Sequence, residues 1–71
     1  MDVNKLKGKI KGMGYTQKEL AEQIGLSLSR FNAKLNGNKA VFTLGDVCAM
    51  KRILNLSPEQ VDEIFFDEKV S

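Results

Sequence analysis

The sequence of 71 residues contains no histidine, a single cysteine and a single proline. Histidine is the commonest zinc ligand and the usual general base of enzymes, so its absence argues against a zinc site and against most acid–base catalysis. Cys48, as the only cysteine, cannot form a disulfide within the chain. No nucleophile–base pair, phosphate-binding loop or cluster of metal ligands can be assembled from the remaining residues. We therefore expect no catalytic residue, no metal and no cofactor, and the chain is not predicted to be an enzyme.

Long apolar runs are also missing. No segment approaches the roughly 20 apolar residues that a membrane span requires, and no positively charged start is followed by an apolar run. We therefore expect a cytoplasmic protein that does not contact a membrane. Apolar residues make up 42% of the chain and charged residues 28%, which is ordinary for a globular protein. A single domain of this length removes only about 60% of its unfolded surface from water, so its stability should be modest.

The net charge of +2 is distributed unevenly along the chain. Basic residues exceed acidic residues by three in segment 1–14 and by two in segment 15–40, whereas acidic residues exceed basic ones by three in segment 41–71. A polyanion would be attracted to the first two segments, and the acidic segment is expected to lie away from it. The lysines of the first segment are interpreted as a solvated helix surface rather than as phosphate ligands. They are Lys5, Lys7, Lys9 and Lys11.

Residues 16–37 predict two short helices joined by a brief turn. Thr16 and Glu19 have the spacing of a capping box, which starts a first helix. Gly25 can adopt the left-handed conformation that ends this helix. Ser27 can cap a second helix, which Asn36 and the following glycine would stop. Two capped helices with so short a connection are the outline of a helix-turn-helix.

The apolar residues of this pair indicate which side of each helix is buried. Leu20, Ala21 and Ile24 share one face of the first helix, and Phe31 and Leu35 share one face of the second. Ala21 is predicted to lie where the two helices cross, because a sharp crossing requires a small side chain at the closest approach of the backbones.

A further helix is predicted on the N-terminal side of this pair, between Asp2 as its cap and Gly14 as its end. Its apolar stripe consists of Val3, Leu6, Ile10 and Met13. Gly8 and Gly12 each cost about 1 kcal/mol relative to alanine in a helix interior. This helix should therefore depend on packing against the rest of the chain.

Two more helices are predicted in the C-terminal half. Thr43 and Asp46 form a second capping box, and the helix that they start would end at Asn55. Ser57 and Pro58 then begin a fifth helix, because proline is well suited to the first helical position. The inward residues of the fourth helix are expected to be Leu44, Val47, Cys48, Met50, Ile53 and Leu54, and those of the fifth Val61, Ile64 and Phe65. With no strand-like alternation in the sequence, the fold class is all-α, and Cys48 is predicted to lie in the core.

The pattern Thr-Gln-x-x-Leu-Ala-x-x-x-Gly-x-Ser at residues 16–27, followed by Asn36-Gly37, resembles the Cro/repressor (xenobiotic-response-element, lambda-repressor-like) family of phage and bacterial DNA-binding domains. The resemblance implies one compact five-helix lambda-repressor-like domain spanning residues 1–71, with the helix-turn-helix at 16–37 in the second and third helices. It also implies a function: sequence-specific transcriptional regulation, as by a phage or prophage repressor that binds double-stranded operator DNA.

In such domains the second helix of the motif enters the major groove and the preceding helix crosses the phosphate backbone. Base contacts are expected from the face turned away from the core, which carries Leu28, Ser29, Arg30, Asn32 and Ala33. Phosphate contacts are expected from Gln17, Lys34, Asn36, Asn38 and Lys39. Leu28 could instead pack against the fourth helix, and its burial distinguishes the two possibilities.

The chain departs from the family pattern at three positions. The family often has glutamine or arginine where this chain has Leu28 and Ala33, so base recognition is expected to be relatively apolar. Many relatives carry glutamate where this chain has Leu35, a difference that fits a phage-repressor variant.

One helix face cannot bury both Phe65 and Phe66, so Phe66 is predicted to be exposed and, with Val70, to form a weak homodimer. The acidic residues near the C-terminal end are interpreted as a solvated surface. The alternative function is a protein-interaction module, such as an antitoxin-like or anti-repressor subunit with the same fold.

Overall fold

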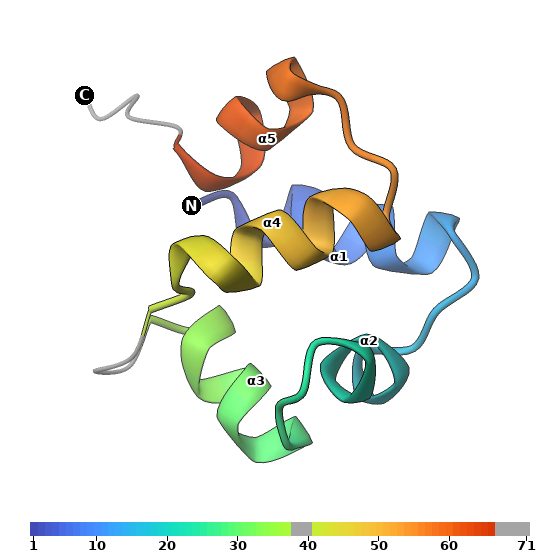
Figure 1. Ribbon diagram of the computed structural model, residues 1–71, viewed down its shortest axis with the longest axis vertical. Coiled ribbons are helices and arrows are strands. Elements are labelled where there is room, and N and C mark those ends of the chain that lie inside the picture. The colour runs from blue at the N-terminus through green and yellow to red at the C-terminus, as the bar shows by residue number, and fades with distance from the viewer. Residues whose placement is uncertain (38–40, 67–71) are drawn as a thin grey trace.

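The structure is a computed structural model, which describes residues 1–37 and 41–66. In these ranges the regular structure consists of five helices (Figure 1). They are α1 (Val3–Gly12), α2 (Gln17–Gln23), α3 (Leu28–Leu35), α4 (Leu44–Ile53) and α5 (Pro58–Phe65). No strand occurs among the described residues. The prediction of an all-α fold is therefore confirmed, together with the order of the helices.

Each helix begins at the cap that the sequence predicts. In α2, the Thr16 hydroxyl accepts from the Glu19 amide at 3.0 Å, and the Glu19 carboxylate accepts from the Thr16 amide at 2.9 Å. The same reciprocal arrangement starts α4 and α5. Asp2 and Ser27 cap α1 and α3 through one side-chain hydrogen bond each. Because a cap of this kind contributes about 1 kcal/mol, local sequence determines where every helix starts.

The core is a single apolar cluster to which all five helices contribute. No polar side chain is buried in it within the described ranges. Phe42, in the connection to α4, packs its ring against Phe31 at a centroid distance of 5.6 Å and against Phe65 at 6.2 Å. This aromatic row joins α3 to α5. The buried residues are Leu6, Ile10, Leu20, Ala21, Phe31, Leu35, Val47, Met50, Leu54, Leu56, Val61 and Ile64.

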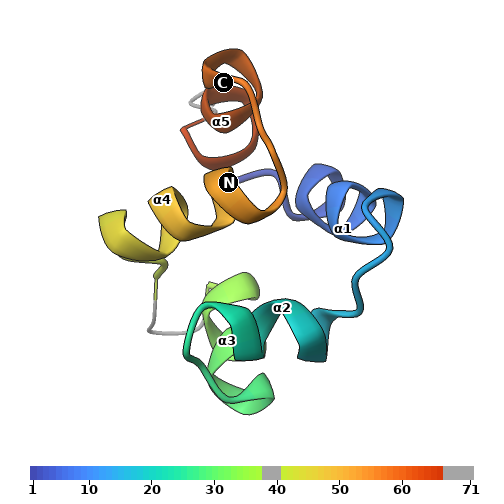
Figure 2. The ribbon, with the colours of Figure 1, turned by 45° about the vertical axis from the view of Figure 1, so that its right-hand side comes forward.

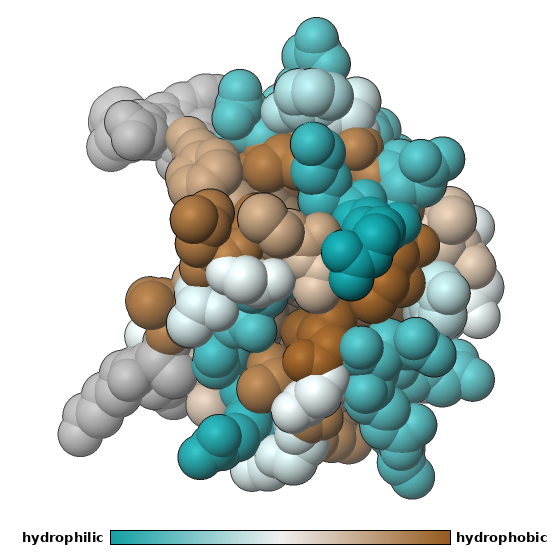
Figure 3. Space-filling view, in the orientation of Figure 1, coloured by the Kyte–Doolittle hydropathy of each residue, from teal (hydrophilic) through white to brown (hydrophobic). Residues whose placement is uncertain are grey.

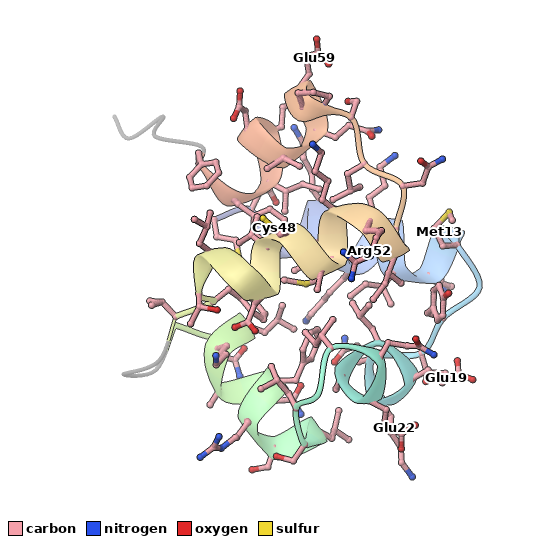
Figure 4. All side chains as sticks on the ribbon, in the orientation of Figure 1. Met13, Glu19, Glu22, Cys48, Arg52 and Glu59 are labelled. Carbon is pink, nitrogen blue, oxygen red and sulfur yellow. The ribbon has the colours of Figure 1, made fainter. Side chains whose placement is uncertain are left out.

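Three apolar residues predicted to face inward are exposed instead. Leu44 is 74% exposed and Cys48 is also exposed, so the prediction that Cys48 lies in the core is wrong. At 3.6 residues per turn, α4 buries only the narrow stripe that holds Val47 and Met50, and both misassigned residues fall beside it. Met13 is exposed because α1 ends at Gly12 and Met13 forms its cap, beyond the helical stripe (Figure 4).

The helices are arranged so that α2 and α3 lie at one end of the molecule and α5 lies at the other, with α1 and α4 between them (Figures 1 and 2). The amide of Asp2 donates to the carbonyl of Ile64 at 2.7 Å, which joins the start of α1 to the end of α5. The acidic residues of α5 are thus held away from α2 and the start of α3. None of the described helices has the length and apolar character needed to cross a membrane.

Candidate nucleic-acid interface

The connection between α2 and α3 is short and fixed by backbone hydrogen bonds. The carbonyl of Ala21 accepts from the amides of Ile24 and Leu26 at 3.2 and 2.9 Å. Gly25 lies between them with a φ of +80°, a conformation that costs a residue with a side chain about 1–2 kcal/mol. Ser27 then starts α3. The turn therefore has little freedom, and the direction of α3 relative to α2 is set by local structure.

Packing fixes the rotation of α3 about its own axis. Phe31 is completely buried and Leu35 almost completely buried, one turn apart on the inward face. On α2, Leu20 and Ala21 are completely buried and belong to the same cluster. A rotation of α3 would bring these apolar side chains into water, so its opposite face is presented to solvent in a defined orientation.

This outward face brings together four of the five predicted base-contacting residues, all except Leu28. Ser29 and Arg30 are exposed, and Asn32 and Ala33 are partly buried. Leu28 lies three residues before Phe31, at the edge of the inward stripe, but it is 40% exposed and is not part of the core cluster. Its contact with DNA stays a prediction. None of the five is buried in the protein.

The predicted phosphate-contacting residues differ in their surroundings. Gln17 is the first residue of α2 and is partly buried, and Asn36 is the exposed C-terminal cap of α3. Asn38 and Lys39 lie outside the described residues. Gln17 and Asn36 thus belong to the α2–α3 pair, one at its start and the other at its end.

Lys34 has a partner within the protein. Its Nζ atom donates to Oδ2 of Asp46 at 2.8 Å, and the two side chains are only 16% and 14% exposed. Burial is the largest single influence on the pKa of the Asp46 carboxyl, and it raises this pKa. The Lys34 ammonium and the hydrogen bonds from Thr43 together lower the pKa by more, so it lies below its ordinary value. Sequence reasoning missed this pair, since the two residues lie on different helices and twelve positions apart.

The pairing changes the electrostatics of the candidate interface. Apart from Lys34, the cations of α2 and α3 are Lys18 and Arg30, both exposed and without an ion-pair partner among residues 1–37 and 41–66. Glu19 and Glu22 of α2 balance them, and Figure 4 shows both carboxylates pointing away from the body of the molecule. The positive charge of segment 15–40 is therefore less available to a ligand than the sequence suggests.

A second surface lies where the ends of α3 and α5 meet the start of α4. It contains a hollow of about 340 Å³, which we call the apolar hollow, and Figure 3 shows hydrophobic surface gathered beside it. Phe66, predicted to be exposed, is 54% exposed at this hollow, whereas Val70 lies outside the described residues. The hollow is lined by Met1, Lys34, Gly37, Val41, Phe42, Val47, Phe65 and Phe66.

Among residues 1–37 and 41–66, the outward face of α3, which is mixed polar and apolar, and the apolar hollow are the two candidate binding surfaces considered for function. The chain matches no model of a known protein family, no curated protein and no solved structure. Its function has to be inferred from the chemistry of these two surfaces.

Proposed function

We propose that the protein is a sequence-specific DNA-binding transcriptional regulator, of the type represented by phage and prophage repressors. In this proposal α2 and α3 are the helix-turn-helix of a lambda-repressor-like domain. One observation carries it: the inward face of α3 is locked by Phe31 and Leu35, while Ser29, Arg30 and Asn32 stand together on the opposite side. A capped, rotationally fixed helix with hydrogen-bonding groups on its free face is suited to enter a major groove.

The side chains of this face support specific roles. Ser29 and Asn32 can exchange hydrogen bonds with base edges, and asparagine pairs well with adenine. Leu28 and Ala33 offer apolar contact to a thymine methyl group, and Arg30 can reach a guanine or a phosphate. Gln17 and Asn36 would position the helix through phosphate contacts, joined by Asn38 and Lys39 from the connection that follows.

A second copy of the chain is proposed as the occupant of the apolar hollow. Phe66 is an exposed aromatic ring beside a recess lined mainly by apolar side chains, so two copies related by a twofold axis could each place Phe66 in the recess of the other. A dimer of this kind would favour inverted half-sites about one helical turn apart. It would regulate by occupying promoter DNA and excluding polymerase, which requires no catalysis.

The test of DNA binding is selection of bound sequences from a random duplex library, followed by titration of the selected duplex. We expect Asn32→Ala to weaken specific binding by about 1–3 kcal/mol, because it removes a base contact. The matched control is Asn4→Ala, which removes an exposed asparagine of α1. If no duplex is enriched, or if both variants bind as well as the parent protein, the proposal is wrong.

Sedimentation velocity tests the dimer. Phe66→Ser should shift the protein toward the monomer while the monomer stays folded, since Phe66 is 54% exposed and is not part of the core cluster. Met13→Ser is the control, because Met13 is also exposed but lies far from the hollow, on the opposite side of the view in Figure 4. Equal association of the parent protein and the Phe66 variant would contradict the dimer.

The alternative function, a protein-interaction module of the antitoxin or anti-repressor kind, is favoured by the same hollow. In that case a different protein, rather than a second copy, would occupy it. Tight binding of a purified partner that Phe66→Ser abolishes, with no duplex enriched in the selection, would support this alternative over the regulator.

A further inference from the structure

The Lys34–Asp46 pair occupies a special place in the fold. Lys34 lies in the last turn of α3, and Asp46 is the third residue of α4. The same oxygen of Asp46, Oδ2, accepts from Lys34 Nζ at 2.8 Å and from the backbone amide of Thr43 at 3.0 Å. One atom therefore joins the end of α3 to the cap that starts α4.

The surroundings of this pair distinguish it from an ordinary surface ion pair. Both side chains are mostly buried, and Lys34 lines the apolar hollow beside Phe42 and Val47. By contrast, Lys5 and Glu63 are 3.8 Å apart and more than half exposed. Exposed pairs are screened by water and contribute little, whereas a largely buried charge that loses its partner is strongly destabilising. Lys34 is therefore held in the protein and is poorly placed to approach a phosphate.

We propose that Lys34 and Asp46 are positioning residues, which fix the end of α3 against the start of α4 and so set the orientation in which α3 presents its outward face. This inference rests on the proposed DNA-binding function. It gives Lys34 a different role from the phosphate contact that the sequence predicts. It also adds Asp46, acting through Lys34 and the cap of α4, to the residues on which specific binding depends.

The two roles of Lys34 make opposite predictions for Asp46→Asn. Asparagine at this position can still accept from the Thr43 amide, so the cap of α4 is kept while the charge is lost. If Lys34 is a phosphate ligand, removal of its competing anion should strengthen binding to every duplex. If Lys34 is a positioning residue, the substitution should weaken binding to the selected duplex.

The experiment is a double-mutant cycle of Lys34→Met and Asp46→Asn, measured on the selected duplex and on an unrelated duplex at several salt concentrations. We expect each single variant to weaken binding to the selected duplex roughly tenfold and the double variant to be no weaker than either, because residues in one contact do not act additively. Binding to the unrelated duplex, and the salt slope, should not change. Lys51→Met is the control for loss of one exposed lysine.

The inference is overturned if Lys34→Met weakens both duplexes equally and reduces the salt slope by about 0.9, the signature of a lost phosphate contact. It is also overturned if Asp46→Asn strengthens binding. A second measurement needs no DNA: NMR titration of the Asp46 carboxyl carbon should show a lower pKa in the parent protein than in Lys34→Met. Equal pKa values would disprove the pair itself, whereas absence of binding to any duplex, with the pair intact, would disprove the DNA-binding function.

Discussion

Ala21 offers the most direct test of how the orientation of α3 is fixed. Its side chain is completely buried in the α2 part of the core, and its carbonyl accepts two hydrogen bonds from the turn that leads to α3. Protein interiors are close-packed, so a larger side chain at this position has no free volume to occupy. Ala21→Leu should therefore force α2 and α3 apart while leaving every residue of the outward face unchanged.

The magnitude follows from overpacking. Inserting additional methylene groups into a packed core costs about 1–3 kcal/mol. In a domain of this size each kcal/mol lowers the melting temperature by roughly 4–8 °C, so we expect a fall on the order of 10 °C. Ala21→Gly is the matched comparison, because it loses about 1–2 kcal/mol through helix propensity and a lost methyl group without forcing the helices apart.

Both variants are to be compared by thermal unfolding, followed by circular dichroism, and by affinity for the selected duplex at a temperature where both are folded. We expect similar losses of stability but a loss of specific affinity only in Ala21→Leu. If the leucine variant melts at the temperature of the parent protein and binds with equal affinity, the crossing at Ala21 does not determine the position of α3, and the reasoning fails.

Further predictions concern acid stability, glycine positions and salt. The pKa of the Asp46 carboxyl is lowered on folding from its ordinary value of 3.8. The carboxylate therefore stabilises the protein above that ordinary value, and the contribution is lost as pH falls through the lowered pKa. Urea unfolding should show Asp46→Asn less stable than the parent near neutral pH, with the difference disappearing in acid. In the same assay, Gly25→Ala should lower the free energy of unfolding by about 1–2 kcal/mol, because Gly25 has a φ of +80°. Gly8→Ala should raise it by about 1 kcal/mol, because the new methyl group meets open space and alanine favours the helix. The logarithm of DNA affinity should fall with the logarithm of salt concentration, with a slope near −2 per subunit if the two exposed cations, Lys18 and Arg30, each meet a phosphate, and steeper by about one if Lys39 does so too.

The features of the fold that could be predicted from sequence are those determined within four or five residues. The capping boxes at Thr16 and Thr43 are formed by side chains three positions apart, so the sequence contains all the atoms that make them. The left-handed residues that follow α2 and α4, Gly25 and Asn55, were equally predictable from their side chains. The inward residues of α3 followed from helical spacing, because this short helix packs on one side only.

The errors concern properties that depend on how helices meet. Spacing along α4 did not show that only a narrow stripe touches the core, so Leu44 and Cys48 were assigned to the wrong side. The partner of Lys34 could not be predicted either, since it depends on the angle between α3 and α4 and on a connection of several residues. A lysine at the edge of a helix looks the same in sequence whether it contacts a phosphate or an aspartate.

The charge balance of the α2–α3 surface bears on how such a domain could bind DNA at all. Phosphate contacts supply most of the non-specific attraction of a protein for DNA, and here Lys34 is neutralised within the protein while two glutamates of α2 offset Lys18 and Arg30. A single copy should therefore bind unrelated DNA poorly and depend on base contacts from α3. In a dimer, binding of one copy to DNA raises the effective concentration of the second copy at the neighbouring half-site. Dimer formation through the apolar hollow would therefore strengthen DNA binding by the outward face of α3. Loss of the dimer in Phe66→Ser should then weaken DNA binding even though Phe66 lies away from the outward face.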